Sequence, residues 1–253
     1  MKTSPYRRVV GILVVASSSF FSLCAQNRTA ADKCGAEIKL LLVPAEIQSA
    51  VKAFRAGSPT NGHIYLFDTE TLELFSRGVI LRVRKGAKAT DLMVKVRVPV
   101  DQALSSDGLE RDYKCEVDRS DDAAVRSYSV LSKIAGPLPD SGNDVLRLLS
   151  PAQKRLLKTA HISPDWNRVQ MVVDVTSTVW RIVDEPSLTR LALEMWQWHS
   201  GQLLELSTKT VGDGDSVETQ LRQTVARKGL SVSATQEQKT ALALGKAKRL
   251  SSP

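Results

Sequence analysis

Four segments of the chain place charged side chains at alternate positions, with aliphatic residues between them. The charged residues are Glu37 and Lys39 in AEIKLLL, Arg82 and Arg84 in GVILRVR, Lys95 and Arg97 in LMVKVRV, and Lys114, Glu116 and Asp118 in YKCEVD. Side chains two positions apart on a β-strand point to the same face, so each segment has one apolar and one charged face. If the charged faces converge inside a closed sheet, they form a lumen suited to a polyanion and a metal ion. If they face water, the segments belong to an ordinary half-exposed sheet.

The residue types in these segments indicate which chemistry such a lumen could support. Guanidinium and ammonium groups bind phosphate oxygens, and carboxylate oxygens are ligands of Mg²⁺ and Mn²⁺. His63, His161 and His199 are scattered and have no cysteine or acidic neighbours at metal spacing, so they do not indicate a zinc site. No nucleophile with an adjacent base stands out, so no catalytic residue is assigned.

The first 25 residues have the layout of a secretory signal peptide. Lys2, Arg7 and Arg8 precede an apolar stretch at 9–16, and a region of small residues offers a cleavage point after Ala25. The apolar stretch is too short for a permanent membrane span. We therefore expect an exported protein, periplasmic or secreted. A lipoprotein site at Cys24 and a twin-arginine export route are open alternatives.

The net charge indicates which kind of ligand the protein can bind, and the cysteine content indicates whether it contains a disulfide. The formal charge is +8, and it falls to +5 without the first 25 residues, which hold three basic and no acidic side chains. This mild excess suits acidic small ligands, and the lack of an arginine-rich helix or an aromatic RNA-binding motif argues against nucleic acid. Beyond the signal peptide, Cys34 and Cys115 form an even pair that favours a disulfide in an exported protein. Two unpaired buried thiols are the alternative, and the oligomeric state is left open.

The hydrophobic pattern predicts an α+β domain with at least eight strands. Alternating runs predict strands at 36–41, 63–68, 79–84, 92–98, 113–118, 169–175, 178–183, 190–196 and 203–209. Helical spacing predicts helices from Pro44 to Gly57, between 123 and 160, from Asp215 to Gly229 with a capping box of Asp215 and Glu218, and at 235–244. Such a strand meander can close into a barrel, which removes exposed edges.

The block YLFDTETLELFSRGVILRVR, followed by LMVKVRV, resembles the CYTH superfamily, the triphosphate tunnel metalloenzymes. The matching residues are Tyr65, Phe67, Asp68, Thr69, Leu74, Gly78, Leu81, Arg82, Arg84 and Lys95, and the resemblance extends over about Gly35 to Leu244. It implies an antiparallel eight-stranded tunnel with flanking helices, in which basic side chains hold a triphosphate and glutamates hold divalent cations. The expected domains are a signal peptide at 1–25, a leader at 26–34, the tunnel domain at 35–245 and a basic tail at 246–253.

The resemblance also implies the site residues. The expected metal ligands, for Mg²⁺ or Mn²⁺, are Glu37, Glu116, Glu194 and Glu205. The expected phosphate contacts are Lys39, Arg82, Arg84, Lys95, Lys114 and Lys239, to which we add Arg181. Of the expected metal ligands, Glu194 shares its face with Trp196 and Trp198, which suits packing as well as metal binding.

Two positions depart from the family pattern. The first strand of the family runs Glu-x-Glu-x-Lys, but here Gly35 replaces the first glutamate, and the closing strand has Ser207 where an acidic pair is common. Both changes weaken cation binding and leave anion binding intact. We therefore expect an exported protein that binds tripolyphosphate or a related phosphorylated ligand, with metal-dependent hydrolysis of the terminal phosphoanhydride as an open question. The alternative is a non-catalytic binding or structural protein of the cell envelope that reuses the tunnel and binds partners on its outside.

Overall fold

The computed structural model describes residues 34–250 apart from 106–112, 121–122 and 212. The expected signal peptide, and the expected leader up to residue 33, lie outside the described residues. Within the described part of the chain, no helix is both long and apolar enough to cross a membrane.

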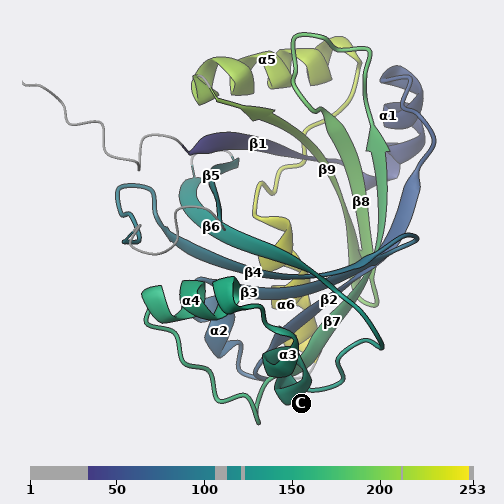
Figure 1. Cartoon of the computed structure of the whole chain (residues 1–253). Coiled ribbons are helices and arrows are strands. Elements are labelled where there is room, and N and C mark those ends of the chain that lie inside the picture. The colour runs from purple at the N-terminus through teal and green to yellow at the C-terminus, as the bar shows by residue number, and fades with distance from the viewer. Residues whose placement is uncertain (1–33, 106–112, 121–122, 212, 251–253) are drawn as a thin grey trace, which may run out of the picture.

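Nine strands of the described chain close into a barrel (Figure 1). They are β1 (Gly35–Leu42), β2 (Thr60–Asp68), β3 (Val79–Gly86), β4 (Thr90–Pro99), β5 (Lys114–Ser120), β6 (Ala123–Ile134), β7 (Gln170–Arg181), β8 (Ala192–Trp198) and β9 (Gly201–Thr210). Around the barrel the order is β1, β5, β6, β4, β3, β2, β7, β8, β9, and β9 pairs with β1 to close the ring. Strands β1 and β5 run parallel, and the other neighbouring pairs run antiparallel.

The expectation of an eight-stranded antiparallel tunnel is therefore wrong in two respects: within the described residues the barrel has nine strands, and one pair of neighbouring strands, β1 and β5, runs parallel. Residues 123–134, which were expected to be helical, form β6, because this strand hydrogen-bonds to β4 on one side and β5 on the other. Val130, Leu131 and Ile134 fit helical spacing. In the strand, however, neighbouring residues point to opposite faces, so that Val130 packs in the outer core and Leu131 lines the cavity. The two runs at 169–175 and 178–183 form a single strand, β7. The parallel pair arises because β5 follows β4 in sequence but lies between β6 and β1 in the ring.

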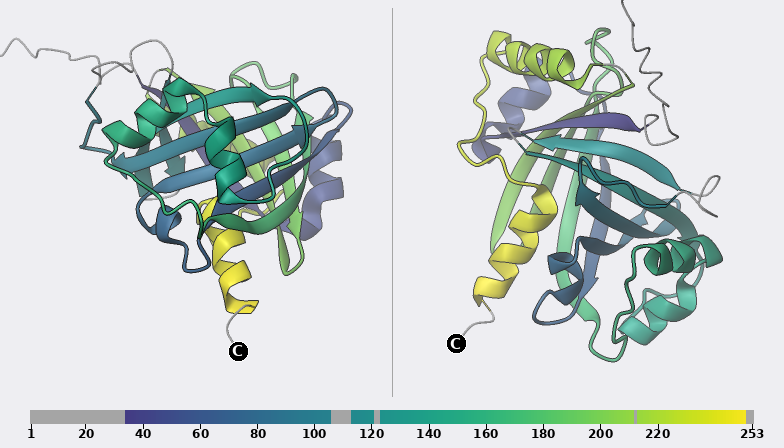
Figure 2. Two further views of the ribbon diagram at one scale, coloured as in Figure 1. Left: turned by 60° about the horizontal axis from the view of Figure 1, so that its bottom comes forward. Right: turned by 90° about the vertical axis from the view of Figure 1, so that its left-hand side faces the viewer.

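Helices cover two outer faces of the barrel. Helix α4 (Pro151–Thr159) packs on the outer side of β4 and β6, and α3 (Gly142–Leu148) adds Val145 to the same outer core. The left view of Figure 2 shows both helices across the sheet. Gln153 fixes α4 there, because its buried amide donates hydrogen bonds to the backbone oxygens of Leu92 (2.8 Å) and Val130 (3.3 Å). Helices α1 (Ile47–Ala53) and α5 (Gly214–Arg227) pack on a second core formed by the outer faces of β1, β8 and β9. The N-cap of α5 is Asp213, so the expected capping box at Asp215 is wrong.

A third apolar cluster fills one part of the barrel interior. Helix α6 (Lys239–Leu250) contributes Ala243 and Leu244, which pack with Ile64, Trp196 and Leu203 from inner strand faces. Figure 2 shows this helix in yellow against the strands. Apolar side chains occupy this part of the interior. The rest of the interior is lined mainly by the charged side chains of the alternating segments.

Residues of the resemblance block build the turn between β2 and β3. The buried carboxylate of Asp68 accepts hydrogen bonds from the backbone nitrogens of Thr69, Leu74 and Phe75, which closes the turn around the short helix α2 (Glu73–Ser76). Gly78 has a φ of +76°, and a β-carbon there would lie 2.5 Å from the backbone oxygen of Arg97. Only glycine fits this position. Asp68 and Gly78, two residues of the resemblance block, therefore have a structural role, because they fix the turn that leads into β3.

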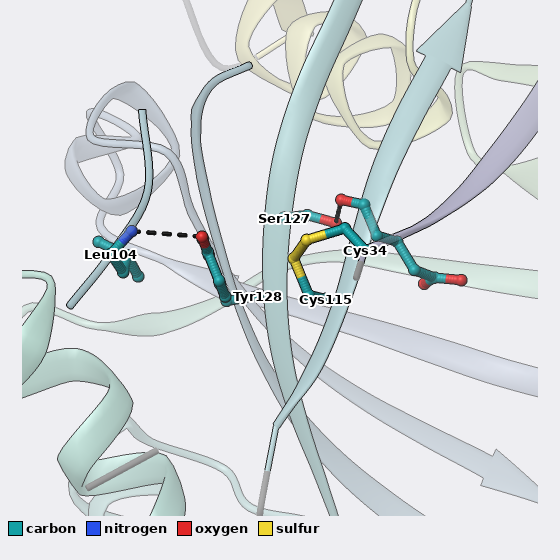
Figure 3. The surroundings of a disulfide bond; sticks show 6 residues. Cys34, Leu104, Cys115, Ser127 and Tyr128 are labelled. Atoms are coloured by element: carbon teal, nitrogen blue, oxygen red, sulfur yellow. Dashed lines mark hydrogen bonds between the residues drawn. A yellow bond between two sulfur atoms is a disulfide. The ribbon is translucent and has the colours of Figure 1, made fainter. Parts of the chain in front are cut away.

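A disulfide lies at the parallel seam of the barrel. Strands β1 and β5 pair over four residue pairs, from Gly35 with Glu116 to Ile38 with Arg119. Cys34 and Cys115 are joined as expected, with 4.8 Å between their α-carbons (Figure 3). The bond therefore fastens the strand that carries Glu37 to the strand that carries Glu116.

Candidate anion-binding lumen

The charged faces of the strands converge inside the barrel, as predicted. They surround a cavity of about 590 Å³. The charged side chains that line it are Glu37, Lys39, Arg82, Arg84, Lys95, Arg97, Lys114, Glu116, Glu194, Glu205, Lys209 and Lys239. With the buried Asp118, which pairs with two of these lysines, the described residues give the lumen eight basic and five acidic groups, a net charge of +3.

Three carboxylates gather at the parallel seam. The ligand oxygens of Glu37, Glu116 and Asp118 lie within 4.8 Å of one another. The register explains this, because Glu37 is paired with Asp118 across the seam and Glu116 lies two residues before Asp118 on the same face. We call these three residues the acidic trio.

Lysine side chains bridge the acidic trio. Lys209 Nζ lies 2.9 Å from Glu37 Oε1 and 2.6 Å from Glu116 Oε1. Lys39 Nζ lies 2.9 Å from Glu37 Oε2 and 2.8 Å from Asp118 Oδ1. Two further lysines contact the trio. Lys95 contacts the second oxygen of Asp118, Oδ2, at 2.9 Å, and Lys114 contacts Glu116 Oε1, which Lys209 also contacts, at 2.6 Å.

These contacts shift the pKa values of the groups involved. Burial alone would raise the pKa of Glu37, but the ammonium groups of Lys39 and Lys209 lower it to about 2. Burial likewise opposes the charged form of Asp118, yet Lys39 and Lys95 hold its pKa well below the usual range. Burial lowers the pKa of Lys95 to about 8, because Asp118 is shared with Lys39 and only partly offsets the cost. Glu37 and Asp118 are therefore ionised at neutral pH, and lysine ammonium groups balance their charge.

A second charged group lies where α6 meets the strands. Lys239 Nζ pairs with Glu194, lies 2.7 Å from Glu205 Oε1, and sits 4.9 Å from the centre of the Trp196 ring. Glu194 also accepts hydrogen bonds from Ser177 Oγ and Trp196 Nε1, both at 2.8 Å. Burial opposes the charge of Glu194, but Lys239 and these donors bring its pKa down to about 2. This group joins α6 to β8 and β9.

Two arginines of the lumen have unused hydrogen-bond donors. The Nε atoms of Arg82 and Arg97 are buried without an acceptor. Within the described chain, Arg82 has no carboxylate within ion-pair distance, and its terminal nitrogen meets the sulfur of Met93 at 3.4 Å, which is a weak acceptor. Arg97 lies 3.8 Å from Asp118 Oδ2, a loose contact. Burial lowers the pKa of both guanidinium groups, although both stay charged. Both arginines line the cavity, where their guanidinium groups would attract an anion.

Most of the expected site residues line the cavity, but they do not form the expected groups. Lys39, Arg82, Arg84, Lys95, Lys114 and Lys239 line it, together with Glu37, Glu116, Glu194 and Glu205. Arg181 is exposed at the end of β7 and does not line the cavity. The four expected metal ligands separate into two groups, because Glu194 and Glu205 gather around Lys239 while Glu37 and Glu116 belong to the acidic trio.

Three charged residues of the described lumen were absent from the expected site. Asp118 completes the acidic trio, and its alternation with Glu116 was the signal that could have placed it there. Arg97 alternates with Lys95 in the same way. Lys209 lies opposite Glu37 in the β1–β9 pair, and only the closure of the barrel brings these two residues together.

The acidic trio does not fit a divalent cation as it stands. It supplies hard carboxylate oxygens, which Mg²⁺ and Mn²⁺ require. However, both oxygens of Glu37 and both oxygens of Asp118 already face lysine ammonium groups, and Glu116 Oε1 faces two of them. A metal ion would have to displace at least one lysine.

No protein-family model and no curated protein matches this sequence. Solved structures do match. HpAC1 from Hippeastrum, named a putative adenylyl cyclase with a dominant triphosphatase activity, is 18% identical, with a TM-score of 0.56 over 83% of this chain and 94% of that one. A putative adenylate cyclase from Bacillus halodurans is 12% identical, with a TM-score of 0.58 over 83% of this chain and 97% of that one. At these identities the likeness concerns the fold, and it agrees with the strand motifs: the chain has a divergent CYTH-like tunnel fold.

Proposed function

We propose that the lumen binds inorganic tripolyphosphate or a related phosphorylated ligand. The observation that carries this proposal is the pair of guanidinium groups that line the cavity without a close carboxylate. Among the described residues Arg82 has none within ion-pair distance, and Arg97 has only the loose contact of 3.8 Å with Asp118. A guanidinium group buried without a close carboxylate costs free energy, and an anionic ligand would offset that cost through charge-assisted hydrogen bonds.

Size and charge support the same ligand class. The cavity of about 590 Å³ falls in the range of small-molecule sites, which is about 300–1,000 Å³. A triphosphate carries several negative charges close together, so it needs several cations around it. The arginines and Lys95, on the neighbouring strands β3 and β4, provide them on one wall of the lumen.

Metal-dependent hydrolysis of the terminal phosphoanhydride is the second candidate. It is favoured by the acidic trio, and a solved structure of the same fold is named for a dominant triphosphatase activity. Mg²⁺ or Mn²⁺ would be held by Glu37, Glu116 and Asp118 once a lysine had moved away. We place this candidate second because Gly35 and Ser207 remove two carboxylates that the family pattern supplies.

We further propose that the protein acts outside the cytoplasm, in the periplasm or as a secreted protein. The disulfide between Cys34 and Cys115 suits an oxidising compartment, and the first 25 residues have a signal-peptide layout. Mass spectrometry of the exported protein, which should begin near Gln26, tests this proposal.

The binding proposal is tested by calorimetric titration of the oxidised protein with tripolyphosphate, with and without Mg²⁺, while phosphate release is followed in the same samples. We expect saturable binding by the wild type and its loss in the double variant Arg82→Glu/Arg84→Glu. Arg181→Glu, outside the lumen, is the matched control and should bind normally. Unchanged binding by the double variant would exclude the lumen. No binding by the wild type would favour an envelope protein that uses its outer surface.

A further inference from the structure

Lys209 occupies the position in the acidic trio at which a bridging cation would sit. It extends from β9, directly opposite Glu37 in the antiparallel β1–β9 pair. Its ammonium contacts Glu37 Oε1 at 2.9 Å and Glu116 Oε1 at 2.6 Å. One positive group thus joins two carboxylates from different strands, as a bound metal ion does in a carboxylate site.

The remaining contacts complete the charge balance of the trio. Lys39 bridges Glu37 and Asp118, and Lys95 takes the other oxygen of Asp118. With Lys209 in place, three lysine ammonium groups oppose three carboxylates before Lys114 is considered. A divalent ion would therefore enter a site without net negative charge, and its oxygens would first have to leave their ammonium partners.

Of these lysines, Lys209 is the one whose removal would take a cation from both Glu37 and Glu116 without reducing the basic wall. Lys39 and Lys95 contact Asp118, next to Arg97, whereas Lys209 contacts only Glu37 and Glu116 within the described chain. Lys114 shares Glu116, but its side chain is 53% exposed and contacts one carboxylate.

We infer that Lys209 is a built-in cation that takes the place of a divalent metal ion, so that the lumen binds its phosphorylated ligand without a metal and excludes free Mg²⁺ and Mn²⁺. The statement about the ligand rests on the proposed function. The exclusion of metal does not, because it concerns the trio alone.

The first test uses Mn²⁺ alone, measured by calorimetry and by the electron paramagnetic resonance signal of free Mn²⁺. We expect no saturable binding by the wild type and one Mn²⁺ site in Lys209→Met, at least tenfold tighter than any wild-type binding. Lys209→Arg keeps the charge and should resemble the wild type. Lys52→Met, an exposed change on α1, controls for the general loss of a lysine. Adding Glu116→Gln to Lys209→Met should abolish the new site.

Two results of this test would overturn the inference. One is Mn²⁺ binding by the wild type as tight as by Lys209→Met. The other is a Lys209→Met protein that is folded by circular dichroism and still does not bind Mn²⁺.

The second test needs no variant, and it decides the ligand half of the inference even if Lys209→Met does not fold. Tripolyphosphate is titrated into the wild type in EDTA and in Mg²⁺. We expect binding in EDTA that is at least as strong as in Mg²⁺, whereas binding that requires Mg²⁺ would overturn the inference. No binding in either buffer would refute the proposed function and the ligand half of the inference, while the Mn²⁺ comparison would still decide its metal half.

Discussion

Glu37 and Asp118 are paired directly across the parallel seam between β1 and β5, and the ammonium group of Lys39 contacts both carboxylates. Two like charges at neighbouring strand positions would repel each other without that lysine. The most distinctive part of the lumen therefore depends on the one strand pair that breaks the antiparallel pattern of the barrel.

The seam should depend on its disulfide for stability. Replacing both Cys34 and Cys115 by serine opens a loop with a sequence separation of 81 residues, and we expect a loss of about 2–4 kcal/mol in the free energy of unfolding. Urea unfolding followed by circular dichroism measures it. Wild-type protein unfolded in a reducing agent should match the double variant. Equal midpoints for the oxidised wild type and the variant would show that strand pairing alone holds the seam.

The arginines should account for much of the ligand affinity. Replacing Arg82 by methionine keeps an unbranched apolar stem but removes the guanidinium group and its charge-assisted hydrogen bonds, each worth about 1.5–3 kcal/mol. We expect tripolyphosphate to bind about tenfold to a hundredfold more weakly. Calorimetry measures this, with Arg181→Met as the control. An affinity within a factor of two of the wild type would mean that Arg82 does not contact the ligand.

Acid should weaken the attachment of α6 through Glu194. Because the pKa of this carboxyl is lowered from 4.5 to about 2 in the folded protein, the stability it contributes is fully present above pH 4.5 and is lost as the pH falls towards 2. Glu194→Gln should reduce stability at pH 7 by about 1–3 kcal/mol. Its stability should also fall less than that of the wild type between pH 4.5 and 2.

Urea unfolding at several pH values measures both effects of Glu194→Gln. Glu37, whose pKa is also lowered to about 2, titrates in the same window in both proteins, so the difference between the two curves isolates Glu194. Parallel curves would contradict the assignment.

Restoring the missing glutamate should strengthen a metal site once Lys209 is gone. Gly35 is paired with Glu116 across the seam, and a β-carbon there would come no closer than 3.4 Å to another atom, the backbone oxygen of Thr210. Gly35→Glu should therefore fit the strand. In the Lys209→Met background we expect it to tighten Mn²⁺ binding at least tenfold, as measured by calorimetry. Gly57→Glu, outside the lumen, should have no such effect.

The sequence predicted the inner face of the barrel better than its connectivity. Period-two alternation is local, so Arg82 and Arg84 on β3, and Lys95 and Arg97 on β4, could be assigned to one face before any partner was known. The same rule could have identified β6, where Ser127 and Ser129 alternate with the outward-facing Tyr128 and Val130.

The partners of the lumen residues could not be predicted in the same way. The contact of Lys209 with Glu37 depends on which strands meet when the ring closes, and those strands are more than 150 residues apart. The grouping of Glu194 and Glu205 around Lys239 depends on where α6 packs. A single sequence holds no local signal for either contact. Arg181 shows the converse error, since it was added to the expected phosphate contacts but lies exposed at the end of β7, away from the cavity.

The lumen draws on residues from near both limits of the described chain, from Glu37 on β1 to Lys239 on α6. During synthesis, β1 leaves the ribosome about 170 residues before its neighbour β9, so it must wait without that partner. Contacts of such long range slow folding, because much of the chain has to be ordered before they form. A growing chain that stops short of residue 239 lacks part of the set of lumen charges. The proposed ligand would therefore stabilise the protein only after nearly all of the domain has been made.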